Sequence, residues 1–304
     1  MVHIKIEKLL ALPQHEQRSP EWFAQRYTKL TSSDAATVLG LGPYGKPHEL
    51  LFKKCGYDPK PFVSNVATLH GQKWEDTAIE LYCRITGRVN YNFGCICYTD
   101  VHKDFSDYNS KCDFLAGSPD GIAESLRDPN EEPVLLEVKC PYRRPIKDGY
   151  IPVYYYPQVQ LNLFICDLSI ADFIEFCPKT NKLNIVRIAK DMNWINTNLP
   201  CLIQFWKDVE YYREIGIENH IEYIKKKERD EKREKNKKEK QERMKLLQHN
   251  SPIFTDMTEN VNGNDYDNDN DNVNGNGYEN YNEDDNDETY IFGENKKRKC
   301  IIID

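Results

Sequence analysis

A carboxylate interrupts one of the most apolar segments of the chain. Glu137 lies within the run Val134-Leu135-Leu136-Glu137-Val138, and Lys139 follows directly. The run has the composition of a buried strand, in which an unpaired charge is costly unless a cation or a metal ion compensates it. Because side chains two positions apart in a strand share a face, we predict that Glu137 and Lys139 lie side by side.

A second carboxylate, Asp120, belongs to a tight bend marked by proline and glycine, Ser118-Pro119-Asp120-Gly121. The acidic link from Arg127 to Pro133 then returns the chain, so that the strands before and after it can pair. This hairpin is predicted to bring Asp120 beside Glu137.

Motifs on both sides of this hairpin reveal a resemblance to a known family. Pro119-Asp120 followed by Glu137-Val138-Lys139 resembles the PD-(D/E)xK nuclease signature. The flanking segments are similar to the exonuclease of phage lambda and to the YqaJ-type viral recombinases, over roughly Arg18 to Trp206. The flanking motifs are Arg26 followed by Thr31-Ser32-Ser33, then Gly71-Gln72-Lys73-Trp74-Glu75, and then Tyr155-Tyr156-Pro157-Gln158-Val159-Gln160.

The resemblance implies a site for Mg²⁺, for which Mn²⁺ can substitute. Asp120 and Glu137 would be direct ligands, the Val138 backbone carbonyl would complete the site, and Glu75 would supply a further carboxylate. Phosphodiester hydrolysis needs a nucleophilic water and a stabilised leaving oxygen, and Mg²⁺ held by carboxylates provides both. The alternative for Glu75 is an exposed helix glutamate with no role in chemistry.

Two further side chains complete the catalytic group that the resemblance implies. Lys139 would orient the attacking water and offset negative charge on the phosphate. Gln158 would hold a water or the lysine by a hydrogen bond, although a helix-surface amide without a role is the alternative. Gln160 is two residues farther on and faces elsewhere on a helix, so we leave it out of the site.

A third group of residues is suited to binding an anion. Ser32 or Ser33 is expected to cap a short helix, whose free backbone N–H groups attract an anion, and Arg26 can add a bidentate contact. In the family this constellation grips the 5′-phosphate of the strand being cut, and Ser118 would also touch the scissile phosphate. The alternative is an ordinary helix arginine beside an ordinary cap.

The resemblance therefore implies a Mg²⁺-dependent DNA exonuclease that hydrolyses one strand of linear duplex DNA, 5′ to 3′, in viral recombination or end repair. The alternatives are a structure-specific endonuclease and a nuclease-inactive DNA-binding scaffold. The sequence does not decide whether the substrate is DNA or RNA. Intact Asp120, Glu137 and Lys139 speak against the scaffold. The implied partners are duplex DNA ends, a single-strand annealing protein and two further copies in a homotrimer. The implied location is intracellular, in the host cytoplasm or nucleus.

The elements that must position these residues indicate an α/β (α+β) domain. The resemblance implies a restriction-endonuclease-like core, with a mixed central sheet flanked by helices. Local patterns predict helices over 20–29, 35–39, 47–55, 65–86, 154–165 and 193–215. They predict strands over 91–99, 113–122, 134–138, 170–177 and 183–188.

Charge divides the 304 residues into three predicted segments. Residues 1–224 would form the exonuclease-like domain, and 225–250 a charged helical extension that could act as a basic arm on nucleic acid or have no role. Residues 251–304 would form a disordered tail rich in Asn and Asp, with a short basic cluster at 296–299 that resembles a nuclear-targeting signal. No apolar run is long enough to span a membrane. The ten cysteines are expected to be reduced.

Overall fold

The computed structural model describes residues 2–43, 45–57, 65–103 and 111–249. The chain divides into a compact unit that includes Met1–Ile217 and a second unit, Glu218–Thr289. The predicted tail and its basic cluster lie outside the described residues. The boundaries at 224 and 250 remain predictions.

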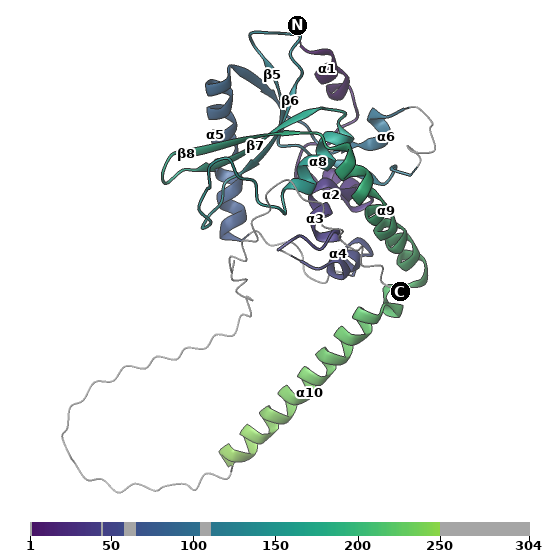
Figure 1. Cartoon of the computed structure of the whole chain (residues 1–304). Helices are drawn as coiled ribbons and strands as arrows, with labels where there is room; N and C mark the ends of the chain where they lie inside the picture. Colours follow the sequence, from purple (N-terminus) through teal and green to yellow (C-terminus); the bar gives the residue numbers. More distant parts are fainter. Residues whose placement is uncertain (1, 44, 58–64, 104–110, 250–304) are drawn as a thin grey trace, which may run out of the picture. The chain divides into compact units, whose positions relative to one another are not determined.

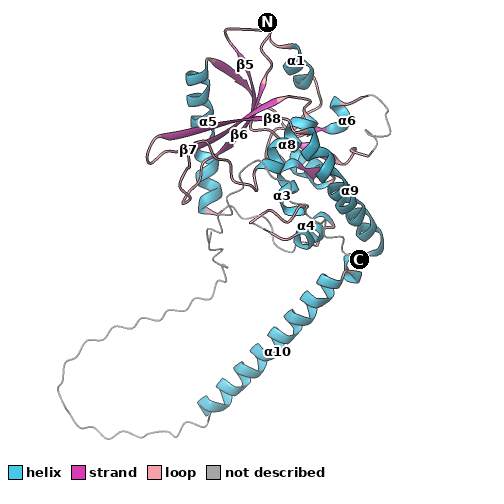
Figure 2. Cartoon of the chain, in the orientation of Figure 1, coloured by secondary structure: helices cyan, strands magenta, loops and turns pink. Residues whose placement is uncertain are grey.

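A mixed five-stranded sheet forms the centre of the first unit (Figures 1 and 2). Its strands run in the order β2-β5-β6-β7-β8. The central pair β6–β7 is parallel, whereas β2–β5, β5–β6 and β7–β8 are antiparallel. This arrangement confirms the predicted mixed sheet. The strands are β2 (Arg88–Tyr91), β5 (Gly121–Ser125), β6 (Val134–Lys139), β7 (Ile170–Cys177) and β8 (Lys182–Ala189).

A smaller sheet has the order β1-β4-β3, with β1 (Leu30–Thr31), β4 (Leu115–Gly117) and β3 (Ile96–Cys97). The single strand predicted over 113–122 is therefore wrong, because β4 and β5 belong to different sheets. The break falls at Ser118-Pro119-Asp120, where proline cannot donate a ladder hydrogen bond. The strand predicted over 91–99 is also wrong: its residues are divided among β2, β3 and the short helix α6 (Tyr98–Val101).

Helix α5 (Val66–Thr86) covers one face of the five-stranded sheet (Figure 1). The side chain of Asn65 caps its first turn, and Gly87 ends it in the left-handed conformation at φ 68°. Ala78 and Tyr82 pack there against side chains of β6 and β7. Tyr82 also donates a hydrogen bond to the buried carboxylate of Asp172 on β7, at 2.7 Å.

Helix α8 (Tyr156–Ile165) packs against strands of both sheets and lies in the crossover between the parallel strands β6 and β7. It also contacts α3 (Ala35–Val38) and α9 (Met192–Ile215). The remaining elements of this unit are α1 (Ile4–Leu10), α2 (Pro20–Tyr27), the 3₁₀ turn η1 (Ser32–Asp34) and α4 (Pro47–Lys54). The 3₁₀ turn η2 (Ile217–Asn219) spans the boundary between the two units. Helices α1 and α6 have no counterpart among the predicted elements.

The second unit contains α10 (Ile221–His249), whose side chains are exposed from Lys225 to Leu246. In the part of the chain that the structure describes, no helix is long and apolar enough to cross a membrane.

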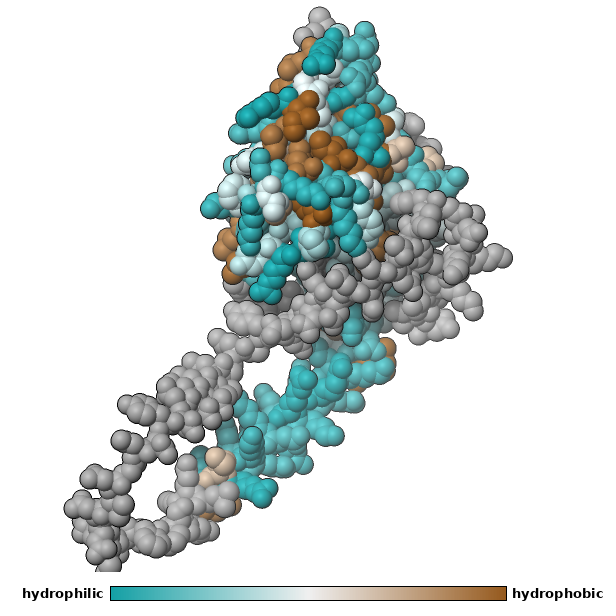
Figure 3. All heavy atoms as spheres, turned by 60° about the vertical axis from the view of Figure 1, so that its left-hand side comes forward, coloured by the Kyte–Doolittle hydropathy of each residue, from teal (hydrophilic) through white to brown (hydrophobic). Residues whose placement is uncertain are grey.

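Figure 3 shows the side of the first unit on which α5 lies. Apolar residues form an area on this surface, and hydrophilic residues border it.

Candidate active site

The bend before β5 places Asp120 beside β6, as predicted. Gly121 is the register partner of Leu136, and the Asp120 N–H donates to the Leu136 carbonyl at 3.2 Å. One oxygen of the Asp120 carboxylate accepts a hydrogen bond from the Val138 N–H at 2.7 Å. The bend is therefore fixed to the strand that carries Glu137.

Glu137 is fully buried on β6, and three side chains donate hydrogen bonds to it. Its Oε1 atom accepts from Lys139 Nζ and from Gln158 Nε2, each at 2.5 Å. Its Oε2 atom accepts from Asn162 Nδ2 at 3.2 Å. The predicted face shared by Glu137 and Lys139 is confirmed, and α8 supplies the two amides.

The negative charges of Glu75, Asp120 and Glu137 repel one another. Burial raises the pKa of Glu137 to about 7, and Asp120 and Glu75 add to the rise, while Lys139 works against it. Burial likewise raises the pKa of Glu75 to about 7, with Asp120 as the next cause, and Arg18 works against it at 3.6 Å. The group therefore holds protons near neutral pH that a bound cation would displace.

Lys139 is the cation at the centre of this group. Its Nζ lies 2.5 Å from Glu137 Oε1 and 3.9 Å from Asp120 Oδ2. Burial disfavours the charged form, but Glu137 and Asp120 outweigh that effect and raise the pKa of Lys139 above its usual range. The ammonium group also lies 5.3 Å from the centre of the Tyr155 ring. Lys139 stays charged and offsets part of the carboxylate charge.

Glu75, Asp120 and Glu137 offer carboxylate oxygens, the ligand type that Mg²⁺ prefers, and Arg18 and Lys139 offset only part of their negative charge. Among the described residues, no three His, Cys, Asp or Glu side chains are arranged to hold a metal ion. In this structure, the Lys139 ammonium group supplies positive charge beside Glu137 and Asp120.

A second cluster surrounds Arg26 on α2. Its Nη1 atom donates to Ser118 Oγ at 3.1 Å, and its Nη2 atom donates to Ser33 Oγ at 2.8 Å and to Thr31 Oγ1 at 3.3 Å. The guanidinium carbon lies 4.3 Å from the centre of the Trp22 ring. The structure thus brings Arg26, Ser33 and Ser118 together. Ser118 is two residues from Asp120, so the bend connects this cluster to the carboxylates.

The predicted cap at Ser32 or Ser33 is wrong. Thr31 is the N-cap of η1, and its N–H and hydroxyl both donate to Asp34 Oδ2, at 3.0 and 2.7 Å. Asp34 in turn precedes α3. The segment begins with a 3₁₀ turn, and its capping pair is Thr31 with Asp34. The cap therefore lies one or two residues before the predicted positions. Ser32 is buried, with 1% of its surface exposed, and its side chain does not face solvent.

Residues 21–169 match the sequence profile described as the YqaJ-like viral recombinase domain. The chain carries a YqaJ-like viral recombinase domain. This match confirms the resemblance that the motifs indicated.

Two viral proteins are similar in sequence to this chain. Protein R354 of Acanthamoeba polyphaga mimivirus is 32% identical over 218 residues, which are 66% of this chain and 37% of that protein. Protein D345L of African swine fever virus is 28% identical over 185 residues, 53% of this chain and 49% of that protein. The chain thus spans less than half the length of these relatives.

The fold of the YqaJ-like domain is that of an alkaline exonuclease. The crystal structure of LHK-Exo from Laribacter hongkongensis has a TM-score of 0.50, with 23% identity, and covers 70% of this chain and 99% of its own. LHK-Exo in complex with dAMP has a TM-score of 0.52, with 22% identity and the same coverage. The predicted restriction-endonuclease-like fold class is confirmed.

Two features of the YqaJ-like domain escaped the sequence analysis. Asn162 donates to Glu137, and its position four residues after Gln158 on α8 is the signal that could have identified it. Its Oδ1 atom is buried without a hydrogen-bond partner among the described residues, and a Cβ added at Gly117 would lie 2.4 Å from it. Gln160 faces elsewhere, as predicted, and donates to the Ala189 carbonyl at 2.8 Å.

The second feature is a buried ion pair under the Arg26 cluster. Lys54 Nζ lies 2.9 Å from Asp34 Oδ2, and it also donates to the backbone carbonyls of Arg26 and Lys29, at 3.0 and 2.7 Å. Lys54 is 6% exposed. The pair links α4 to the segments that carry Arg26 and Thr31, so it positions the cluster. No sequence pattern marks a buried partner twenty residues away.

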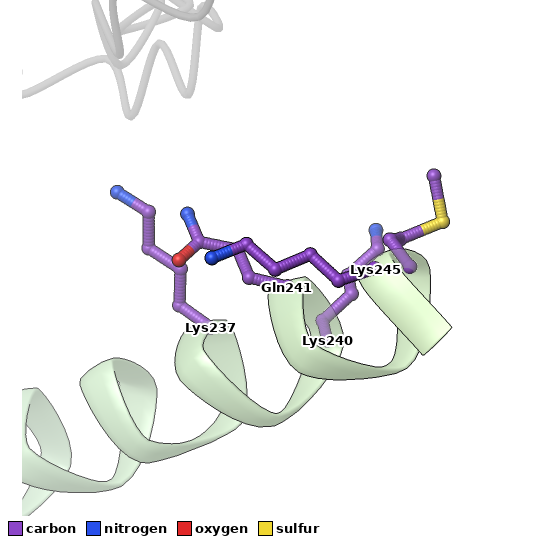
Figure 4. A pocket seen from close by; sticks show the side chains of 5 residues that line it. Lys237, Lys240, Gln241 and Lys245 are labelled. Carbon is purple, nitrogen blue, oxygen red and sulfur yellow. The ribbon is translucent and has the colours of Figure 1, made fainter. Parts of the chain in front are cut away.

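A shallow pocket lies on α10, and it is formed by one face of that helix (Figure 4). No carboxylate lines it, and three of its five lining side chains are lysines, so it does not suit Mg²⁺. Its lining residues are Lys237, Lys240, Gln241, Met244 and Lys245.

Proposed function

We propose that the protein is a metal-dependent deoxyribonuclease, an exonuclease that digests one strand of linear duplex DNA in the 5′ to 3′ direction. The observation that carries this proposal is the bend 118–120. On one side of this bend lies the cluster of Arg26, Ser33 and Ser118, which is suited to a phosphate. On the other side lie the carboxylates with the half-buried Lys139. A nuclease needs those two sites next to each other.

Glu75, Asp120, Glu137 and the Val138 carbonyl would hold Mg²⁺, or Mn²⁺ in its place. The negative charge of this donor set and its raised carboxyl pKa values support that assignment. When bound, the metal would lower the pKa of the attacking water and stabilise the leaving oxygen.

The chain's own side chains would position the reactants. Lys139 carries a permanent charge at the site, so it would orient the water and offset negative charge that develops on the phosphate. Gln158 and Asn162 hold the Glu137 carboxylate from α8, which keeps its orientation fixed while the substrate exchanges.

Arg26, Ser33 and Ser118 would bind the terminal 5′-phosphate. An arginine that already donates to three hydroxyl groups presents a preorganised guanidinium, and the hydroxyl protons can turn toward the anion. Ser32 would contribute through its backbone, since its side chain is buried. A grip on the terminal phosphate would make the enzyme act from ends.

The wider role is part of the same proposal and is supported by the match to the viral recombinase domain. The exonuclease would serve viral recombination or end repair, with a single-strand annealing protein, as a homotrimer around DNA and in the host cytoplasm or nucleus. Residues 1–224 would form the enzyme, 225–250 an accessory helix and 251–304 a tail.

The test compares linear duplex with a 5′-phosphate, linear duplex with a 5′-hydroxyl and covalently closed circles, each with Mg²⁺ and with EDTA. We expect digestion of linear DNA only with Mg²⁺, and the 5′-phosphate form to be digested faster. One charge-assisted contact is worth about 1.5 to 3 kcal/mol, or roughly one to two decades in rate. Circles cut as readily as linear DNA would replace the exonuclease with a structure-specific endonuclease.

Variants then assign the preference to the cluster. Arg26→Ala and Ser33→Ala should each reduce the 5′-phosphate preference while leaving residual cutting, because the carboxylates are unchanged. Arg84→Ala is the matched control, since Arg84 is exposed on α5. A full preference in Arg26→Ala would contradict the assignment of the phosphate site.

A further inference from the structure

Gly71 occupies a helix position that the protein's own packing does not explain. It lies inside α5, four residues and thus about one turn before Glu75, on the same face. Apart from its chain neighbours and the backbone of its own helix, no atom of the described residues lies within 4 Å of a Cβ built there, and its φ is not in the left-handed region. Glycine inside a helix costs about 1 kcal/mol relative to alanine. Neither crowding nor backbone conformation requires glycine at this position.

An aromatic cluster with positive charge lies next to this glycine. The ring of Tyr142, which is 38% exposed, lies 5.3 Å from the ring of His70, the neighbour of Gly71. The cationic groups of Arg143 and Lys179 lie 5.8 and 5.7 Å from the centre of the Tyr142 ring. These distances fall within the range of cation–π contacts.

The sheet explains why these residues meet beside the carboxylates. Strands β6 and β7 are parallel, so their carboxyl ends lie at one edge of the sheet. Tyr142 follows Lys139 by three residues, and Lys179 follows the end of β7 at Cys177 by two. The cluster is therefore at the end of the strand that carries the candidate catalytic residues.

The positive charge of the cluster is available to a ligand. Lys73, Arg143 and Lys179 are exposed, and among the described residues none of them forms an ion pair. Lys73 Nζ lies 5.2 Å from the ring of Trp74, which precedes Glu75. Two of these cations lie beside the exposed Tyr142 ring and the third lies beside Trp74, an arrangement that matches a polyanion with planar groups.

We infer that a single strand of DNA reaches the active site across the first half of α5, over Gly71 and the Tyr142 cluster. Tyr142 stacks with a base, and Lys73, Arg143 and Lys179 contact phosphates, which is the combination that binds single strands without sequence preference. Gly71 leaves room for the strand to approach Glu75. The inference rests on the proposed nuclease function and adds the path of the substrate.

The first experiment measures binding of a fluorescent 20-nucleotide strand to the full-length protein with Glu137→Gln, in EDTA, by anisotropy. Tyr142→Ala should weaken binding about tenfold. Tyr211→Ala, at an exposed tyrosine on α9, is the control and should leave affinity unchanged. The double variant Arg143→Gln/Lys179→Gln should reduce the magnitude of the slope in a plot of log affinity versus log salt concentration by about 1.4. The control variant Lys207→Gln should leave this slope unchanged.

The second experiment separates approach of DNA from chemistry. Gly71→Ala should unfold at the same or a higher temperature, digest DNA at least about tenfold more slowly, and hydrolyse bis(p-nitrophenyl) phosphate at the wild-type rate. Thr77→Ala, at an exposed position of the same helix, should change neither hydrolysis rate.

The outcomes distinguish this inference from the proposed function. Wild-type protein that cuts neither DNA nor the small phosphodiester would refute the nuclease, and the binding experiment would still test the surface. Wild-type affinity in Tyr142→Ala, or wild-type digestion by Gly71→Ala, would overturn the path over α5.

Discussion

Metal binding should release protons in an amount that depends on pH. The pKa values of Glu75 and Glu137 are both raised to about 7, because Glu137 is buried, Glu75 is half-buried, and Asp120 adds negative charge near both. A carboxyl group with a raised pKa keeps its proton below that pKa, and a metal ion must displace it. The affinity for Mg²⁺ or Mn²⁺ should therefore rise with pH and become constant above about pH 8.

The two pKa values set the size of the effect. Because the negative charges of these carboxyl groups repel one another, the groups keep protons below neutral pH and are ionised well above it. Binding that ionises both groups should release about one proton or more at pH 6 and far less at pH 8. The affinity should fall about 10- to 100-fold between pH 8 and pH 6.

Isothermal titration calorimetry with Mn²⁺ measures both quantities, in buffers of different ionisation enthalpy at each pH. Glu75→Gln removes one of the two protons and should reduce the release at pH 6 by about one. Glu80→Gln, at an exposed position of α5, is the control and should behave as wild type. Release of fewer than half a proton by the wild type at pH 6 would refute the reasoning from burial and carboxylate repulsion.

Three further outcomes are expected. Lys54→Met should destabilise the fold by about 3 to 5 kcal/mol in urea denaturation, because it removes the buried cation that pairs with the half-buried Asp34 carboxylate, whereas Lys53→Met on the exposed side of α4 should have little effect. Lys139→Ala should slow DNA cleavage at least about tenfold but preserve calorimetric Mn²⁺ binding, and loss of binding would show that the lysine has another role. Truncation after Gln248 removes a segment with 12 acidic and no basic residues between Ser251 and Tyr290, so DNA binding at low salt should be equal or tighter, and a folded but inactive truncation would place the tail in the enzyme.

Local patterns predicted the elements that carry the carboxylates. The period of two placed Glu137 and Lys139 on one face of β6, and their hydrogen bond at 2.5 Å confirms it. The bend at Pro119 and the return link placed Asp120 beside the same strand. Asn65 and Gly87 marked the two ends of α5, because caps depend on residues next to the helix end.

Contacts between distant segments could not be predicted in this way. The pair of Lys54 and Asp34 joins residues twenty positions apart, and a lysine in a short helix is exposed by default. The cap at Thr31 depends on a 3₁₀ turn, which has no periodicity to detect. Asn162 looked like one polar residue in an apolar helix, and its role became visible only when α8 was placed against Glu137.

The close approach of Gly117 to Asn162 links two positions that lie 45 residues apart in the chain. A side chain at 117 would meet the Asn162 amide and push it away from the Glu137 carboxylate that it holds. Evolution can therefore change these positions only together. A relative that carries alanine or serine in place of Gly117 should have a residue smaller than asparagine on its equivalent of α8, and it should hold the buried carboxylate through the glutamine one turn earlier.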